Sequence, residues 1–536
     1  MFNLEPTLIL TNGKFWTMND GEPEAEAVAI YDKDIVAVGK SRDIESMAGA
    51  STNVIDLDGR VAIPGLQDIH VHLAMDAMDA KAVEVRDYYD SSIKSVKDIL
   101  KKIETRVSQI DKGKWIHANG SPMQDFRLAE KRFPTKEELD KVSPNNPCYV
   151  NFGAHISVAN SLALKAAGIT KESKDPEGGW IIKDEAGEPN GVLRERAQFL
   201  VNTLDDSKLT ALEDGIEQLL KRVASRGVTV VHDVVTSAEE INAYQNLCNA
   251  GRMPVRVQLL IRIIEAKITT KSLVELGFTQ RFGNDMLKIG GSKMSIDGGF
   301  TGRQAAFSGM KGLVRIQQEE LDETVMACHL AGIRCCVHAI GDIAVDMTLS
   351  SFEKAQKRLP LPDIRHRVEH MGNWLFTSER RKKSKQLGAV PVTNGSLFYF
   401  VADSGEAYIG EERNRGLFPI KTMQKEGLNI ASGSDATLYW PVDVIRDIAA
   451  YVNRKTVMGT LMGPEEAISF REGVRAQTKD ASWVGCEENR AGTIEKGKIA
   501  DLTVFDRNPD ECPPEELKDL PIMMTVCAGR VSFRKE

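Results

Sequence analysis

The chain has 536 residues, enough for roughly three to four domains of ordinary size, although a single barrel can take up about 250 of them. Hydrophobic residues make up 42% and charged residues 27%, which is typical of a folded protein and excludes a disordered chain, a collagen-like repeat or a disulfide-rich miniprotein. The net charge of −8 argues against a general nucleic-acid-binding protein, which would present a basic surface.

The N-terminal segment lacks basic residues, and Glu5 and Pro6 interrupt its apolar run, so it does not resemble a secretory signal. No apolar stretch reaches the roughly 18 residues that a membrane helix needs. The eight cysteines form no C-x-x-C pair. We therefore expect a cytoplasmic protein with reduced cysteines and no membrane partner.

Short β segments occupy both ends of the chain. The first 60 residues contain segments at 7–11, 26–30 and 35–38, and the tail has the same texture at 500–505 and 523–533. This pattern predicts one small β-sandwich domain built from both termini, residues 1–60 and 485–536.

The middle of the chain alternates helical and strand patterns, which favours βα units and a parallel sheet. Amphipathic helical patterns lie between the apolar runs, as at 206–226, 318–331 and 342–357. The apolar runs are 61–69, 228–234, 255–263, 287–296, 333–339, 364–370, 389–393 and 428–434. Eight such runs predict an α/β fold, a (β/α)8 TIM-like barrel over residues 61–484.

The first and second apolar runs are much farther apart than a crossover helix requires. Residues 74–205 are therefore interpreted as a large insertion after strand 1, with strands of its own at 115–119 and 147–152. Because the insertion follows a barrel strand, it should cover the side where barrel active sites form.

The strongest chemical signal is the pair His70 and His72. Two histidines at positions i and i+2 of a strand project to the same face, and paired neutral imidazoles suit zinc or a similar metal. Asp68 could orient one of these ligands. The bland alternative is an accidental pair on a surface turn.

Four further ligand-type residues stand at or near the ends of later apolar runs. They are Lys293, His338, His370 and Asp435. A barrel brings the carboxyl ends of its strands around one opening, so these side chains should meet the histidine pair there. For Lys293, the alternative is a structural ion pair with Asp297.

On these motifs the chain resembles the amidohydrolase superfamily of metal-dependent hydrolases, and within it the branch of YtcJ-type proteins and N-substituted formamide deformylase. The resemblance runs nearly end to end. The stretches that carry it are His155–Leu164, Pro176–Gly179, Gly191–Glu195, Asp297-Gly298 with Arg303, His338–Asp342 and Arg365–His370.

The resemblance implies two divalent metal ions, usually zinc, with manganese or iron as alternatives. His70, His72 and Asp435 would hold the first ion, and His338 and His370 the second. Lys293, carrying a carbamate derived from CO2, would bridge them. A buried lysine favours its neutral amine, which is the form that accepts CO2. Glu195 is the rival bridging ligand.

The remaining candidates concern substrate and support. His155, Trp180 and Arg303 are candidate substrate-binding residues, although Trp180 could equally belong to the core of the insertion. His366 lies four residues before His370, so we expect it on the same strand face, farther from the mouth. His232 could line the pocket without binding metal.

The function expected from this site is hydrolysis of carbon–nitrogen bonds, most of all amide bonds of N-formyl or N-acyl small molecules. Hydroxide formed at the metals would attack the carbonyl, and Asp435 would carry the proton to the leaving nitrogen. The alternatives are a cyclic amidase or deaminase with the same metals, and a non-catalytic scaffold or regulatory barrel. The partner is a small-molecule substrate, and a homodimer is compatible with the pattern.

Overall fold

The structure is a computed structural model that describes residues 5–77, 82–90, 92–153, 155–202, 204, 212–264, 266–414, 416–436 and 440–535. Its centre is a curled parallel sheet with the strand order β20-β19-β18-β17-β16-β15-β8. The strands are β8 (Leu66–Val71), β15 (Val228–Val235), β16 (Arg256–Arg262), β17 (Leu287–Ser295), β18 (Cys335–His338), β19 (Arg367–Glu369) and β20 (Val390–Val392). Neighbours in space follow chain order from β15 to β20, as βα units require.

The first expected barrel strand, 61–69, is divided between two sheets. Residues Val61–Pro64 form β7, which pairs with strands from the chain ends, while β8 starts at Leu66. Gly65 joins the two strands, and an added Cβ there would lie 2.2 Å from Thr229 Oγ1. The absence of a side chain at Gly65 lets the chain pass close to β15 while it changes sheets.

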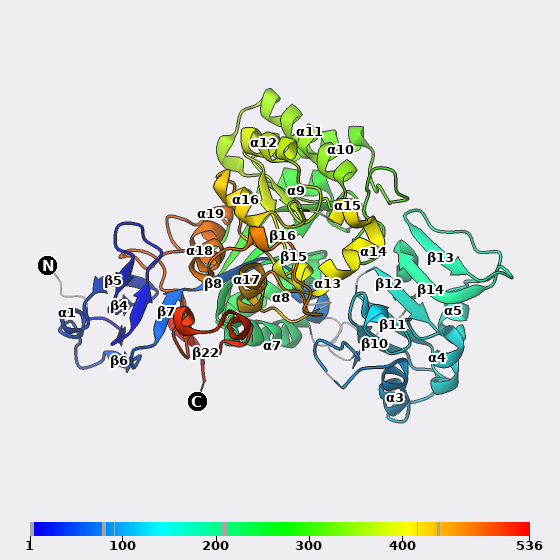
Figure 1. Ribbon diagram of the computed structural model, residues 1–536, viewed down its shortest axis with the longest axis horizontal. Helices are drawn as coiled ribbons and strands as arrows, with labels where there is room; N and C mark the ends of the chain where they lie inside the picture. The colour runs from blue at the N-terminus through cyan, green and yellow to red at the C-terminus, as the bar shows by residue number, and fades with distance from the viewer. Residues whose placement is uncertain are drawn as a thin grey trace.

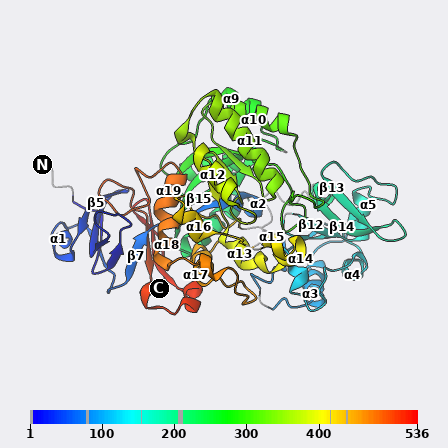
Figure 2. The same cartoon turned by 45° about the horizontal axis from the view of Figure 1, so that its top comes forward.

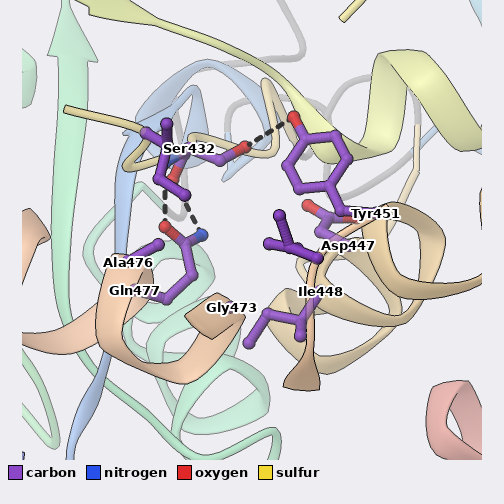
Figure 3. Close-up of a pocket in the computed structure, with 9 residues that line it drawn as sticks. Ser432, Asp447, Ile448, Tyr451, Gly473, Ala476 and Gln477 are labelled. Carbon is purple, nitrogen blue, oxygen red and sulfur yellow. Dashed lines mark hydrogen bonds between the residues drawn. The ribbon is translucent and has the colours of Figure 1, made fainter. Parts of the chain in front are cut away.

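The eighth expected strand, 428–434, is not a regular strand. Instead, Ser432 and Ala436 form isolated parallel bridges to Thr393 and to Val71, which flank the two edges of the parallel sheet. The amide of Gln477 replaces a neighbouring strand: its Oε1 accepts from Ser432 N (2.8 Å) and its Nε2 donates to Ser432 O (2.9 Å) (Figure 3). We call residues 431–436 the seam segment.

The helices pack around the parallel sheet (Figure 1). Side-chain caps start several of them: Ser237, Thr377 and Asp443 each accept from a backbone N–H three residues later. The helices are α2 (Leu73–Ala77), α7 (Leu212–Ser225), α8 (Ala238–Asn249), α9 (Thr270–Leu276), α10 (Gln318–Leu330), α11 (Asp342–Arg358), α12 (Ser378–Leu387), α13 (Gly395–Val401), α14 (Gly405–Ile409), α15 (Glu411–Asn414), α16 (Ile420–Lys425), α17 (Val444–Asn453), α18 (Phe470–Arg475) and α19 (Ala481–Val484). The expected helices 318–331 and 342–357 coincide with α10 and α11, whereas residues 206–211 of the expected helix 206–226 lie outside the described residues.

Between β8 and β15 the chain builds a second sheet, with the order β13-β14-β12-β11-β10-β9. It has hydrophobic clusters of its own. Its elements are β9 (Val83–Glu84), α3 (Val96–Val107), β10 (Ile116–Gly120), α4 (Lys136–Val142), β11 (Cys148–Phe152), β12 (Ile156–Ala159), α5 (Ser161–Ala166), β13 (Gly179–Lys183), β14 (Pro189–Glu195) and α6 (Phe199–Asn202). In Figures 1 and 2 this sheet and the N-terminal strands lie on opposite sides of the central sheet.

The chain ends form two further sheets, ordered β5-β4-β1-β6 and β23-β22-β21-β7-β2-β3. The second contains strands from both ends, and one hydrophobic cluster takes side chains from both sheets. The elements are β1 (Leu8–Thr11), β2 (Lys14–Trp16), β3 (Glu24–Ala25), β4 (Ala27–Tyr31), β5 (Asp34–Gly39), α1 (Ser41–Glu45), β6 (Asn53–Asp56), β7, β21 (Leu502–Phe505), β22 (Ile522–Cys527) and β23 (Arg530–Arg534).

Among the described residues, none of the helices is both long and apolar enough to cross a membrane. The thiols of all eight cysteines are free, and six of the eight are buried.

Candidate metal centre

The site begins where β8 meets the seam segment. His70 lies in β8 and His72 follows its last residue, while Asp435 N donates to His70 O at 2.8 Å. This backbone contact brings the side chains together: Asp435 Oδ1 lies 3.1 Å from His72 Nε2 and 3.5 Å from His70 Nε2. The first strand and the seam segment therefore supply adjacent imidazoles and a carboxylate.

His338 and His370 complete a row of rings with His70. The ring centroid of His370 lies 5.1 Å from that of His70 and 4.5 Å from that of His338. His338 is the last residue of β18, and His370 follows the end of β19 with a φ of 72°. An extended residue there would point away from Glu369, so the left-handed conformation is what turns His370 into the mouth.

Lys293 lies in β17 beneath these rings. Its Nζ is 3.3 Å from His70 Nε2, and the side chain is buried. Burial lowers the pKa of Lys293 to about 8, because the charged ammonium loses its hydration. The Lys293 amine is therefore neutral near pH 7 in a larger fraction of molecules than the amine of an exposed lysine. The alternative ion pair with Asp297 is not formed among the contacts of the described residues, since Asp297 accepts from the N–H groups of Ala306, Ile340 and Gly341.

The protonation states suit metal ligands. Burial lowers the pKa of His70 to about 3 and that of His370 to about 4, and it holds the pKa of His338 well below the ordinary value. Burial opposes ionisation of Asp435, but the hydrogen bond to His72 and the neighbouring histidines outweigh it and keep its pKa below the ordinary value. The cluster therefore offers neutral imidazole nitrogens and a charged carboxylate.

The donor atoms fit a metal ion. One ligand atom each from His70, His370 and Asp435 can be chosen so that all lie within 4.8 Å of one another. Buried His72 Nδ1 and His338 Nε2 have no hydrogen-bond partner among the described residues. Nitrogen and carboxylate donors in a buried cluster are the set that zinc prefers. The trio includes His370, which the sequence reasoning assigns to the other ion from His70.

Three residues that the sequence reasoning did not single out orient the ligands. Glu369 Oε2 lies 2.5 Å from His70 Nδ1, and Arg367 donates to both oxygens of Glu369. Asn394 Oδ1 lies 2.8 Å from His370 Nδ1. In both histidines the supporting oxygen accepts a hydrogen bond from Nδ1–H. The lone pair of Nε2 is therefore the one that can bind a metal ion. The sequence could have indicated the role of Glu369, because Arg367 and Glu369 stand two residues apart and therefore share the inward face of one strand.

The expectation that His366 shares a face with His370 is wrong. His366 precedes the first residue of β19 and packs outside the sheet, stacked on Phe352 at 4.6 Å and hydrogen-bonded to His329 at 2.9 Å. The four-residue spacing fails because the strand spans only Arg367–Glu369. His232 is also buried away from the ligands, and its Nδ1 accepts from Arg367 at 2.9 Å.

Asp68 acts on the backbone rather than on a ligand side chain. Its Oδ1 accepts from His70 N (3.2 Å) and from Ser434 N (2.9 Å), which ties β8 to the seam segment. Burial raises the pKa of Asp68 to about 7. A second buried carboxylate, Asp297, lies next to another ligand candidate: its Oδ1 is 3.5 Å from His338 Nε2.

Glu195, the rival bridging ligand, has other partners. Its Oε2 lies 3.2 Å from His155 Nδ1 and 2.5 Å from the guanidinium of Arg315. His155 is half-buried at the end of the second sheet, and its electrostatic field contributes to the lowered pKa of His338. His155 is therefore within electrostatic reach of the histidine row, whereas Glu195 faces His155.

The other two substrate candidates lie in the same region. Arg303 is 3.7 Å from Asp125 and stacks over Phe126 at 5.0 Å, so it links the loop after β17 to the second sheet's side of the molecule. Trp180 is half-buried in β13, opposite Arg194 in β14. Within the part of the chain that the structure describes, neither Arg303 nor Trp180 forms a hydrogen bond or an ion pair with the metal-ligand candidates.

A sequence model of the amidohydrolase family matches residues 53–533. The chain belongs to the amidohydrolase family. It is 26% identical to the N-substituted formamide deformylase of Arthrobacter pascens over 98% of each chain. It is 27% identical to the amidohydrolase YtcJ of Bacillus subtilis (strain 168), again over 98% of each chain. A solved metal-dependent hydrolase of Pyrococcus horikoshii OT3 matches 95% of this chain and 99% of its own, with a TM-score of 0.74 and 21% identity.

The family and its hydrolase relatives show that the chain is a hydrolase, and its curled parallel sheet is consistent with the fold of the amidohydrolase superfamily. The family that the sequence motifs predicted is confirmed.

Proposed function

We propose that the chain hydrolyses carbon–nitrogen bonds, in particular amide bonds of N-formyl or N-acyl small molecules. The observation that carries the proposal is the convergence of His70, His370 and Asp435, with Lys293 3.3 Å from His70. The similarity to a formamide deformylase over the whole length favours amides over other carbon–nitrogen bonds.

Two divalent ions, zinc or alternatively manganese or iron, would be held by His70, His72, His338, His370 and Asp435, with Lys293 as the bridge. When bound, such ions make a water acidic near neutral pH and polarise a substrate carbonyl. The bridging form of Lys293 requires its neutral amine to form a nitrogen–carbon bond with CO2 and to lose a proton. The pKa of about 8 supports this role.

Asp435 is the proton carrier in this proposal. Its carboxylate is ionised, lies within reach of two imidazoles and is held by backbone contact to His70. An acceptor fixed at that point can take a proton from the attacking water and deliver it to the leaving nitrogen. Glu369 and Asn394 hold the rings of His70 and His370 through Nδ1, so that Nε2 of each ring is oriented toward the proposed metal site.

The domain organisation follows the same proposal. Residues 61–484 would form the catalytic barrel, interrupted by 74–205, which would cover its mouth. Residues 1–60 and 485–536 would form a separate β-sandwich. The bridges of the seam segment to both edges of the sheet support closure of the barrel.

A hydrolysis screen tests the function. The zinc- or manganese-loaded protein would be assayed against N-formyl, N-acyl and cyclic amides, with Asp435→Asn as the matched control. Release of amine and carboxylic acid from the acyclic amides supports the proposal. Exclusive turnover of cyclic amides, or of amino-substituted rings with release of ammonia, would replace it with the corresponding activity.

A further inference from the structure

His232 lies in the middle of β15 and is fully buried. The next residue, Asp233, faces helices α8 and α2, where its carboxylate accepts from Tyr244 Oη at 2.7 Å and from two backbone N–H groups of α2. Because successive side chains of a strand point to opposite faces, His232 points into the interior of the curled sheet. There it contacts Arg367 of β19, a strand that is not a neighbour of β15 in the sheet.

The guanidinium of Arg367 is held from three sides. Arginine has only N–H donors and keeps its charge, so the 2.9 Å contact means that Nδ1 of His232 accepts from it. The same guanidinium donates to both oxygens of Glu369, at 2.7 and 2.9 Å, and to Ile69 O at 2.6 Å. Its acceptors therefore come from β15, β19 and β8.

Glu369 connects this guanidinium to the metal-ligand candidate His70. Its Oε2 lies 2.5 Å from His70 Nδ1, and Ile69 directly precedes His70 in β8. The two-pronged contact between arginine and a carboxylate requires one orientation of the guanidinium plane. His232 and Ile69 O accept from other N–H groups of Arg367 and so fix that orientation.

The tautomer that accepts from Arg367 has a cost. With Nδ1 as the acceptor, a neutral His232 carries its proton on Nε2, and this buried atom has no hydrogen-bond partner among the described residues. Burial and the nearby guanidiniums of Arg367 and Arg334 hold the pKa of His232 well below the ordinary value, so the ring is neutral. An apolar side chain would avoid the unpaired N–H. The contact of Nδ1 is therefore what a histidine supplies at this position.

The surroundings of His232 keep its ring in place. Gln258 is its partner in the register of β15 with β16, and Gln258 Nε2 donates to Gly485 O at 3.2 Å. An added Cβ on Gly485 would lie 3.3 Å from His232 Nε2 and 3.0 Å from Gln258 Nε2. The absence of a side chain at Gly485 thus lets the chain after α19 pack directly against the imidazole.

We infer that His232 is a positioning residue for the metal centre, acting through Arg367. By accepting from that guanidinium, it holds Arg367 against Glu369, whose carboxylate orients the ring of His70. The inference rests on the ligand role that the proposed function gives to His70. It assigns to the interior of the sheet a residue on which metal affinity depends, although His232 itself binds no metal.

Zinc affinity, measured by competition with a chromogenic chelator, tests the inference without any substrate. In His232→Leu the acceptor is lost, and we expect about tenfold weaker zinc binding, the lower end of the effect of removing a partner that orients a ligand. His232→Asn places an amide oxygen near the position of Nδ1, so its zinc affinity should stay within about threefold of that of the wild-type protein. Undiminished zinc affinity in His232→Leu would overturn the inference.

His366→Leu is the matched control. His366 is also buried, its Nδ1 accepts from Cys335 N at 3.0 Å, and it precedes β19 on the outside of the sheet. Its loss should lower the free energy of unfolding, measured by urea denaturation, and leave zinc affinity within about twofold of the wild-type value. A loss of zinc affinity as large as that in His232→Leu would indicate a general effect of packing and contradict the inference.

A double-mutant cycle with Glu369→Gln distinguishes action through Glu369 from a purely structural role. Glutamine offers one acceptor oxygen in place of two, so the two-pronged contact with Arg367 is already broken in that variant. We expect His232→Leu to change zinc affinity by less than about twofold in the Glu369→Gln background. Equal losses in both backgrounds would refute the positioning role.

Imidazole ¹⁵N NMR of the metal-free wild-type protein needs no variant. His232 should carry its proton on Nε2, and a proton on Nδ1 would exclude the contact with Arg367 and overturn the inference. The outcomes also distinguish the two proposals. A wild-type protein that binds no zinc, manganese or iron overturns the ligand role of His70 and this inference with it, whereas zinc binding that does not respond to His232→Leu overturns the inference alone.

Discussion

Glu369 Oε2 lies 2.5 Å from Nδ1 of His70, and both side chains are fully buried. Arg367, on the same inward strand face, donates to both oxygens of this carboxylate and so keeps it ionised and in place. The chain therefore fixes the tautomer and the direction of a metal-ligand candidate through two residues that bind no metal themselves. This arrangement makes the ligand geometry a property of strands β8 and β19 together.

Replacing Glu369 by glutamine should weaken metal binding. The change removes the charge that holds Nδ1–H of His70, and loss of such a partner ordinarily costs about 10- to 100-fold in metal affinity. Zinc affinity would be measured by competition with a chromogenic chelator. Glu487→Gln is the matched control, since Glu487 is also buried and paired with Arg256 but lies outside the metal-ligand group. Equal affinities in both variants would contradict the role of Glu369.

Chelation should abolish hydrolysis, because the cluster of neutral imidazoles and one carboxylate has no other source of an activated water. Activity would be followed in a sample shown by elemental analysis to be metal-free, and then after zinc is restored. The expected result is loss and recovery. Turnover that persists in the metal-free sample would remove the metal mechanism.

Asp435→Asn should keep most of the metal and lose activity by about 10²- to 10⁴-fold, because the amide cannot accept the proton that the carboxylate takes. Metal content and kcat would be measured on the same preparation. Undiminished turnover in this variant would refute the assigned role. Parallel loss of metal would instead show that the carboxylate is needed mainly as a ligand.

Lys293 should be required for the second metal ion and for dependence on CO2. Lys293→Met keeps a similar length and removes the amine, so we expect about half the metal content of the wild-type protein if the bridge is a carbamate. Reconstitution of metal-free protein in CO2-depleted buffer should give low activity that bicarbonate restores. Full metal content in Lys293→Met would argue against the bridge.

Gln477→Ala should destabilise the fold. The amide of Gln477 pairs with both N and O of Ser432, and each buried backbone group left unpaired costs about 1–3 kcal/mol. We expect about 2–4 kcal/mol less free energy of unfolding, measured by urea denaturation. Gln317→Ala, at an exposed position, should change stability by less than about 0.5 kcal/mol. A neutral Gln477→Ala would mean that other groups support the seam segment.

The sequence predicted the parts of the fold that follow from continuous apolar runs. Strands β15, β16 and β17 and helices α10 and α11 coincide with their runs because periodicity is a local property. The apolar run at 428–434 did not predict the seam segment correctly. There the side chain of Gln477, which is distant in sequence, takes the hydrogen bond that a neighbouring strand would otherwise make. A pattern in one segment holds no record of such a partner.

The candidate site divides in the same way. Histidines at strand ends were found because residue type and strand position both indicate metal binding. The error at His366 came from assuming that a strand continued through Arg365–His370, whereas β19 spans three residues and His370 adopts a left-handed φ. Glu369 and Asn394 were missed because a supporting hydrogen bond depends on which ring nitrogen faces which strand.

The backbone contact from Asp435 to His70 has a consequence for how the molecule holds together. It joins the first strand of the parallel sheet to the seam segment, and the nearby pair His72 and Asp435 is separated by 363 positions in the chain. An ion bound by these side chains would cross-link β8 to the seam segment, although the two are far apart in the chain. Because such an ion binds the folded chain and not the unfolded one, its concentration would set the thermal stability of the protein as well as its activity.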